Sequence, residues 1–406
     1  MIHQSSLPAR TPDRNELRAS LFAFVLLVAL KGGLLLFAAW SSSWTIYQII
    51  SGHDACEYFN YARHLANHTL GTLPLEARRH NPGWPLLLAS VYRIALGAVE
   101  FPVLALGAGL ACSAASIILF PKLLAQFPDS REPRNTTLSL PYLTGALALV
   151  AIGYPSQLYY GIFGLSEPLF GVLILGSLIL AGAGKFGLAY MIASGASLVR
   201  APGVLLFPAI FAADAWALYS QAKRGHSSRG STIGFALRTA AGIVLAATPL
   251  GLWSTITARA WSSSYIQIYK PQMGLPFSGF AGIREVGTLR AVYVVFVVAV
   301  FGLSICRLAY LALTSKTISP ASIALVCFSC LFFGFHICVT SLYYIDRVVW
   351  TFNYQDRYLV CLWPVAVLAW GRWLRPWLAG AAGAVSLALS AYWLHNYLQI
   401  AQPCAN

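Results

Sequence analysis

Apolar stretches long enough to cross a membrane dominate this sequence. Hydrophobic residues make up 58% of the chain and charged residues 10%, against about 45–50% and about 25% in soluble domains. A water-soluble core cannot hide that much apolar surface, so we expect an all-α, polytopic bundle of about 11 transmembrane helices, each near the roughly 20 residues that span a bilayer. The expected spans are 19–40, 101–120, 140–154, 168–183, 186–198, 204–218, 235–253, 291–313, 321–341, 358–373 and 377–397.

The distribution of charge predicts which loops face the cytoplasm. Residues 82–98 could cross the membrane or lie flat at its outer surface as an amphipathic helix. The flat placement puts 15 of the 27 Lys and Arg inside and 11 outside, with Lys31 in the first span, and it puts 8 of the 13 acidic residues outside. This agrees with the enrichment of positive residues in cytoplasmic loops.

The flat placement therefore predicts one transmembrane domain over residues 19–397. Residues 1–18 form a cytoplasmic tail and residues 398–406 an external one. Two long external segments, 41–100 and 254–290, lie on the bundle, and the first carries juxtamembrane helices. Six of the eight cysteines fall in apolar stretches, where a thiol acts as a small hydrophobe. Cys56 and Cys404 are the ones expected to meet water, and no disulfide framework is predicted.

The first external segment opens with a cluster of acids, phenols and imidazoles. If Ser51 caps a helix starting at Gly52, residues three and four apart share one face. One interpretation is a helix cap with a solvated face, another is a metal site built from Asp54, Glu57 and His64, and a third is a catalytic carboxylate site. The residues on this face are Asp54, Glu57, Tyr58, Tyr61, His64 and His68.

Cationic groups recur at the predicted outer face. Arg78, Arg79 and His80 precede a rigid turn and suit either a phosphate or anionic lipid headgroups. Arg200 and Arg357 each lie at a helix end, where an arginine can also be a membrane anchor.

Glu167 begins another helix, where a carboxylate can act as a cap. Asp54, Glu57, Glu167, Arg200 and Arg357 all fall on one side of the membrane, at the ends of different helices. This convergence favours a shared site.

Five motifs in order resemble integral-membrane glycosyltransferases of the GT-C fold. The closest pattern is that of polyprenyl-phosphate-sugar-dependent enzymes such as protein O-mannosyltransferases and aminoarabinose transferases. The sequence departs from them in having His53 before Asp54 and its next acid, Glu57, three positions on. The motifs are DACEYFNYARHLA, NPGWPLLLASVYRIALG, LSEPLF, LVRAPG and RYLVCLWP, which extend the resemblance over roughly residues 20–375.

The resemblance implies an inverting transfer of a sugar from a polyprenyl-phosphate carrier to an acceptor hydroxyl on a lipid, glycan or protein. The acid of the first external loop in that family maps onto Asp54, which we expect to be the catalytic base, with Glu57 as the second carboxylate. Cationic side chains would stabilise the departing phosphate, so no cofactor is expected, although a divalent metal is compatible. The expected donor-binding residues are Arg200, Arg357, Arg79, His80, Tyr58 and Glu167.

The expected partners are the donor, the acceptor and membrane lipids. No nucleic acid is expected, because the net charge of +14 belongs mostly to cytoplasmic loops. Few lysines beside abundant Ala, Leu and Arg favour a bacterial inner membrane, with the site facing outward. The alternative class is a secondary transporter or lipid flippase, since Lys31 is a charge within a span.

The topology makes one direct prediction. In a variant whose water-exposed Cys56 and Cys404 are replaced by Ser, a cysteine placed at Ser227, in the 220–234 loop, should be labelled by a membrane-impermeant maleimide only after the membrane is opened. Labelling of intact cells would overturn both the orientation and the outward-facing site.

Overall fold

The computed structural model describes residues 14–52, 54–67, 80–127, 140–225, 229–257, 288–314, 318–342, 359–370 and 376–400. Within these ranges the chain is helical and contains no strand, which confirms the all-α class. The helices are α1 (Arg14–Ser41), α2 (Ile46–Ile50), α3 (Ala55–Ala66), α4 (Gly83–Ile94), α5 (Phe101–Gln126), α6 (Leu140–Ile152), α7 (Pro155–Tyr160), α8 (Glu167–Gly182), α9 (Phe186–Val199), η3 (Ala201–Leu205), α10 (Leu206–Lys223), α11 (Arg229–Thr257), α13 (Thr288–Thr314), α14 (Pro320–Leu342), η5 (Val360–Leu362), α16 (Trp363–Trp370) and α17 (Pro376–Ile400).

Each predicted span coincides with a helix, but the helices differ in length. Six are long and apolar enough to cross a membrane, and the chain is a multi-pass membrane protein on that evidence. Five further apolar helical segments of 10–17 residues were found within the described part of the chain, so the count of 11 spans stays a prediction. They are Leu140–Ile152, Glu167–Gly182, Phe186–Val199, Pro320–Phe335 and Val360–Trp370. The six long segments are Arg14–Ser41, Phe101–Gln126, Ala201–Lys223, Gly230–Pro249, Val295–Thr314 and Trp377–Gln399.

The short helix α6 lies inside the bundle. Leu143 and every residue from Gly145 to Ile152 are buried, so α6 is covered on all sides. Trp363, at the start of α16, donates its indole N–H to the carbonyl of Leu149 over 2.7 Å and stacks on Tyr154. A helix that is apolar all round is buried by its neighbours. We infer that longer helices, rather than lipid, surround α6.

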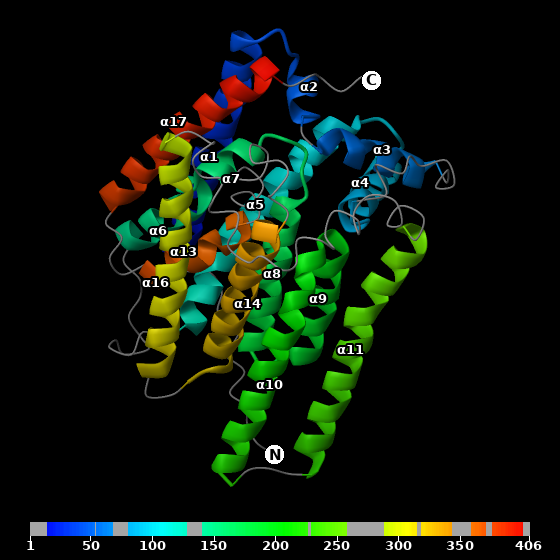
Figure 1. Ribbon diagram of the computed structural model, residues 1–406, viewed down its shortest axis with the longest axis vertical. Coiled ribbons are helices and arrows are strands. Elements are labelled where there is room, and N and C mark those ends of the chain that lie inside the picture. Colours follow the sequence, from blue (N-terminus) through cyan, green and yellow to red (C-terminus); the bar gives the residue numbers. More distant parts are fainter. Residues whose placement is uncertain are drawn as a thin grey trace.

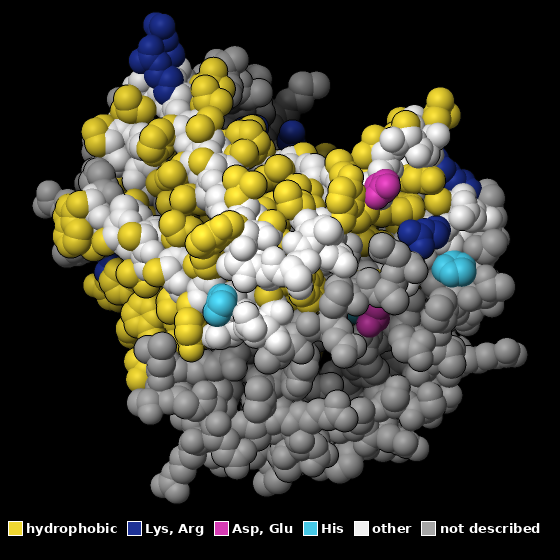
Figure 2. Space-filling view, turned by 90° about the horizontal axis from the view of Figure 1, so that it is seen from above, with side chains coloured by type: hydrophobic (Ala, Val, Ile, Leu, Met, Phe, Trp, Pro, Cys, Tyr) yellow, Lys and Arg dark blue, Asp and Glu magenta, His cyan; other side chains and the backbone are white. Residues whose placement is uncertain are grey.

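The long helix α1 has one face in the bundle and one outside it. Its buried stripe repeats every three or four residues, the spacing of one helical face, and includes Ala23, Leu27, Lys31 and Leu34. The opposite face exposes large apolar side chains such as Leu21. Hydrophobic side chains also cover much of the described surface seen from above (Figure 2). Such a surface is stable in lipid rather than in water.

Helices α3 and α4 lie side by side at one end of the bundle (Figure 1). The end of α10 and the start of α11 lie at the opposite end. At 12 residues, α4 is about 18 Å long, against a hydrocarbon core of about 30 Å. It is shorter than the six long segments, and the flat placement of residues 82–98 stays a prediction.

A buried ion pair joins α10 to α11. Arg238 donates from Nε and Nη2 to the two carboxylate oxygens of Asp214 over 2.8 and 2.7 Å. Asp214 is 1% exposed, so its charge depends on this bidentate contact. Helix α11 contacts little of the bundle beyond α9 and α10, and the ion pair fixes its register there.

Removal of Arg238 should leave the buried carboxylate of Asp214 without its ion-pair partner. We expect Arg238→Met to destabilise the protein by about 3 kcal/mol, because a lone buried charge is far costlier than the pair. Thermal unfolding of the detergent-solubilised protein measures this effect. The double variant Asp214→Leu/Arg238→Met should recover most of the loss, and Lys122→Met, at an exposed position, should change little. Equal instability of the single and double variants would contradict this account.

Candidate functional site

The helix that carries the predicted carboxylates begins later than expected. We predicted a start at Gly52 with Ser51 as its cap, and this is wrong: α3 begins at Ala55, and Asp54 occupies the N-cap position. The Asp54 side chain makes no capping hydrogen bond. Glu57 and Tyr58 follow in the first turn, so all three side chains leave the end of α3 that faces the bundle.

Glu57 is joined to His80, the residue three positions before α4. The His80 Nε2 and Glu57 Oε2 atoms are 2.7 Å apart. The His80 ring also lies against the Tyr58 ring, with 4.5 Å between centroids. Three of the predicted site residues from two separate segments therefore contact one another.

The phenol of Tyr58 extends this contact into the bundle. Its hydroxyl lies 3.3 Å from the Ser166 hydroxyl. Arg200 donates from Nε to the same Ser166 oxygen over 3.1 Å, and its Nη2 is 3.0 Å from Glu167 Oε1. Tyr58, Glu167 and Arg200 are all at most 8% exposed. A continuous chain of contacts thus runs from Glu57 and His80, across the ring contact with Tyr58, and through Ser166 to Arg200 and Glu167.

The backbone after α9 turns Arg200 into this network. Arg200 ends the helix in an extended conformation, with φ −150° and ψ 134°, and the short 3-10 helix that follows begins at Ala201, with Pro202 in its first turn. Gly203 packs so closely on the preceding turn that a Cβ there would lie 2.5 Å from the Ser197 nitrogen. The chain therefore turns back against the end of α9, and the Arg200 guanidinium points toward the start of α8.

Helix α4 is clamped on the end of α9. A Cβ on Gly83 would lie 2.7 Å from the Val199 nitrogen, so only glycine permits this approach. Asn81 donates from its amide to the carbonyl of Ser197 over 3.0 Å. Trp84, which is fully buried, donates to the carbonyl of Gly164 over 2.9 Å. These contacts fix the position of His80, immediately before Asn81.

The same end of α3 could hold a metal ion. One ligand atom each from Asp54, Glu57 and His80 lies within 4.8 Å of the others. Carboxylate oxygen and imidazole nitrogen together suit a divalent ion such as Zn²⁺ or Mn²⁺. The sequence pointed to His64 as the third ligand, because it recurs at helical spacing. The structure brings His80 there instead, from a separate segment.

Six of the eight predicted site residues are therefore brought together by the fold. Arg79 and Arg357 lie outside the described residues. Sequence reasoning missed Ser166, which accepts from Arg200 and contacts Tyr58. The sequence places Ser166 directly before Glu167 in the LSEPLF motif, and this position could have identified it as a site residue. Cys56, in the first turn of α3, is disulfide-bonded, which adds a covalent link that the sequence did not predict.

No protein-family model and no curated protein sequence matches this chain. Its class therefore rests on the fold and the site: a multi-pass helical membrane protein with a partly buried network of acids, imidazole and guanidinium at one end of its bundle.

The clamp at Gly83 offers a test of how the site is positioned. Gly83→Ala should push α4 off α9, shift His80 away from Glu57 and lower the thermal midpoint by several degrees. Gly107→Ala is the matched control, because a Cβ at Gly107 meets no atom within 4 Å. Equal midpoints for the two variants would show that α4 does not depend on this close approach.

Proposed function

We propose that this protein is an inverting glycosyltransferase that moves a sugar from a polyprenyl-phosphate-sugar donor to an acceptor hydroxyl outside the cytoplasm. The observation that carries the proposal is the chain of contacts in which Glu57, beside Asp54, is linked to Arg200 through His80, Tyr58 and Ser166. It brings a pair of carboxylates and a guanidinium to the same end of the bundle, and guanidinium groups suit phosphate oxygens. The acceptor hydroxyl needs a carboxylate to take its proton, and the phosphate leaving group needs a positive charge such as a guanidinium.

Asp54 is assigned as the general base. A single carboxylate within hydrogen-bond reach can take a proton from an attacking hydroxyl. Glu57 is 2.7 Å from His80, a contact that suits an orienting role. Asp54 stands at the N-cap, one turn closer to the start of the helix.

Arg200 is assigned to the donor phosphate. As the carbon–oxygen bond to the phosphate breaks, its electrons stay with the phosphate oxygen, where negative charge grows. A guanidinium presents several fixed N–H donors to such an oxygen. Glu167 holds Arg200 in place over 3.0 Å and so supports the orientation of its donors.

The reaction is a single in-line displacement. The acceptor oxygen forms a bond to the anomeric carbon, its proton passes to Asp54, and polyprenyl phosphate leaves from the opposite side. Inversion at the anomeric carbon follows. Catalysis of this kind depends chiefly on positioning and on charges that stabilise the leaving group.

Two observations support an outward-facing site in a bacterial inner membrane. Disulfides persist in oxidising compartments, and Cys56 is disulfide-bonded beside Asp54. The site end of the bundle is also opposite the junction of α10 and α11, which carries the basic residues Lys223, Arg224 and Arg229.

A secondary transporter or lipid flippase is the second candidate. The observation that favours it is Lys31, which is 3% exposed in the middle of α1. Buried charges within spans commonly mark transport pathways. Sugar transfer by the purified protein would separate the two, because transport leaves no new glycosidic bond.

Replacement of Asp54 by Asn tests the proposed function. We expect sugar transfer from a labelled polyprenyl-phosphate-sugar to fall about 100-fold or more, since loss of a general base typically costs 10²–10⁴-fold. Scintillation counting of labelled product in membranes that contain equal amounts of each variant measures the effect.

Two variants control this experiment. Glu57→Gln should cost less than Asp54→Asn, and the reverse order would mean that Glu57 is the base. Glu100→Gln removes an exposed carboxylate at the N-cap of α5 and should leave transfer unchanged. Near-normal transfer by Asp54→Asn would contradict the assignment of Asp54 as the general base.

A further inference from the structure

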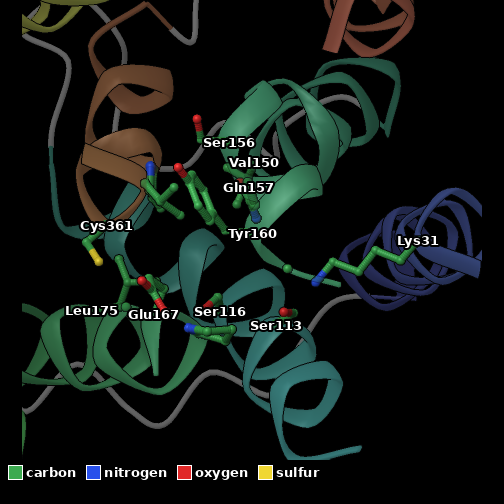
Figure 3. Close-up of a pocket in the computed structure, with 15 residues that line it drawn as sticks. Lys31, Ser113, Ser116, Val150, Ser156, Gln157, Tyr160, Glu167, Leu175 and Cys361 are labelled. Atoms are coloured by element: carbon green, nitrogen blue, oxygen red, sulfur yellow. The ribbon is translucent and has the colours of Figure 1, made fainter. Parts of the chain in front are cut away.

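A charged side chain interrupts the buried stripe of α1. Lys31 stands in the row that contains Leu27 and Leu34, and only 3% of it is exposed. It lies ten residues before the end of α1, about 15 Å along the helix. The side chain extends from α1 toward the other residues that line a pocket in the bundle (Figure 3). It therefore does not follow the usual snorkelling behaviour of a lysine in a span.

Lys31 borders a partly open cavity within the bundle. The cavity volume is about 50 Å³. A single water needs about 10–15 Å³ by the same measure, so the cavity has room for a few waters or for one small polyatomic ion. Its polar lining includes Lys31, Ser113, Ser116, Ser156, Gln157 and Glu167. In Figure 3, Lys31 approaches from one side and Glu167 lies on the other.

Lys31 has no counter-ion in direct contact. Glu167 is paired with Arg200 over 3.0 Å. Among the residues that the structure describes, Lys31 has neither a hydrogen bond nor an ion pair. The Ser156 hydroxyl is likewise buried and without a partner in the described ranges. A buried ammonium without a contacting counter-ion is costly, so Lys31 offers the cavity a positive charge and Ser156 offers it a spare hydroxyl.

The chain keeps room for the ammonium at Gly161. A Cβ on that residue would lie 2.5 Å from Lys31 Nζ and 2.6 Å from its Cε. Any larger side chain would displace the amine from the wall of the cavity. Gly161 follows α7, the helix that also supplies Ser156 and Gln157, so one short segment both admits the amine and lines the cavity beside it.

We propose that the Lys31 cavity binds a phosphate group. A phosphate matches its size, neutralises the charge of Lys31 and accepts hydrogen bonds from hydroxyls such as that of Ser156. Glu167 belongs both to this cavity and to the ion pair with Arg200, so the bound group lies next to the proposed donor site. Two sources have this chemistry. The phosphate of the polyprenyl carrier is one, which rests on the proposed function, and inorganic phosphate is the other.

Ligand-induced stabilisation of the purified full-length protein tests this inference without any sugar transfer. Undecaprenyl phosphate, undecaprenol and inorganic phosphate are titrated separately, and Kd is obtained from the rise in thermal midpoint. We expect Lys31→Met to weaken binding of the phosphate-bearing ligand about tenfold or more, as for loss of a charged hydrogen bond. Lys31→Arg should retain binding, and Lys122→Met, at an exposed position, should match the wild type.

The two sources give different results. Binding of undecaprenyl phosphate but not inorganic phosphate through Lys31 assigns the site to the lipid carrier. Binding of inorganic phosphate alone through Lys31 supports the phosphate site and removes its link to the donor. Equal affinity of the wild type for undecaprenol and undecaprenyl phosphate would overturn the proposal, because only the tail would then be recognised.

A structural role for Lys31 has its own signature. If a water-bridged contact to Glu167 were its whole purpose, Lys31→Met would lower the thermal midpoint and leave phosphate affinity unchanged, which also overturns the proposal. Should Lys31→Met not accumulate, Lys31→Gln keeps a polar side chain in the cavity without the charge and is read in the same way.

Failure here is distinguishable from failure of the proposed function. Asp54→Asn should bind phosphate ligands like the wild type. Phosphate binding that depends on Lys31, together with normal transfer by Asp54→Asn, would support the phosphate site and reject Asp54 as the general base. Unchanged phosphate binding by Lys31→Met, with sugar transfer lost in Asp54→Asn, would reject the phosphate site and support Asp54 as the general base.

Discussion

The buried ion pair between Glu167 and Arg200 holds the functional end of this protein together. Both residues are nearly inaccessible, and neither charge could stay buried without the other. Glu167 opens α8, where the helix dipole favours a carboxylate, and Arg200 closes α9. Ser166 then links the pair to Tyr58 on α3. A surface helix, two helices of the bundle and a cavity are thereby joined at one point.

Lipid accounts for the architecture around that point. Backbone groups in the hydrocarbon core must be satisfied within the chain, which favours helices throughout. The long helices present apolar faces outward, whereas α6 is enclosed by other helices. Irregular backbone is tolerated where protein covers it. The Arg200–Leu205 segment and the turn before α8 meet that condition, because they pack against α4 and α9.

Sequence reasoning succeeded where a local pattern carries the information. Apolar length located a helix at every predicted span, whereas the surface position that charge counting favours for residues 82–98 stays a prediction. It failed at the start of α3, because Ser51 and Asp54 are both common N-cap residues and the sequence does not show which of them begins the helix. It also chose His64 over His80, since helical spacing was the only relation visible between residues.

The sequence by itself determined the all-α membrane class, the order of the helices and which residues are chemically capable of a role. These follow from hydropathy and residue type, which each segment carries alone. Only the tertiary structure decided that His80 meets Glu57, that Ser166 bridges Tyr58 and Arg200, and that Lys31 borders a cavity within the bundle. Such contacts join residues tens to more than a hundred positions apart. They depend on how whole helices pack, which no local pattern encodes.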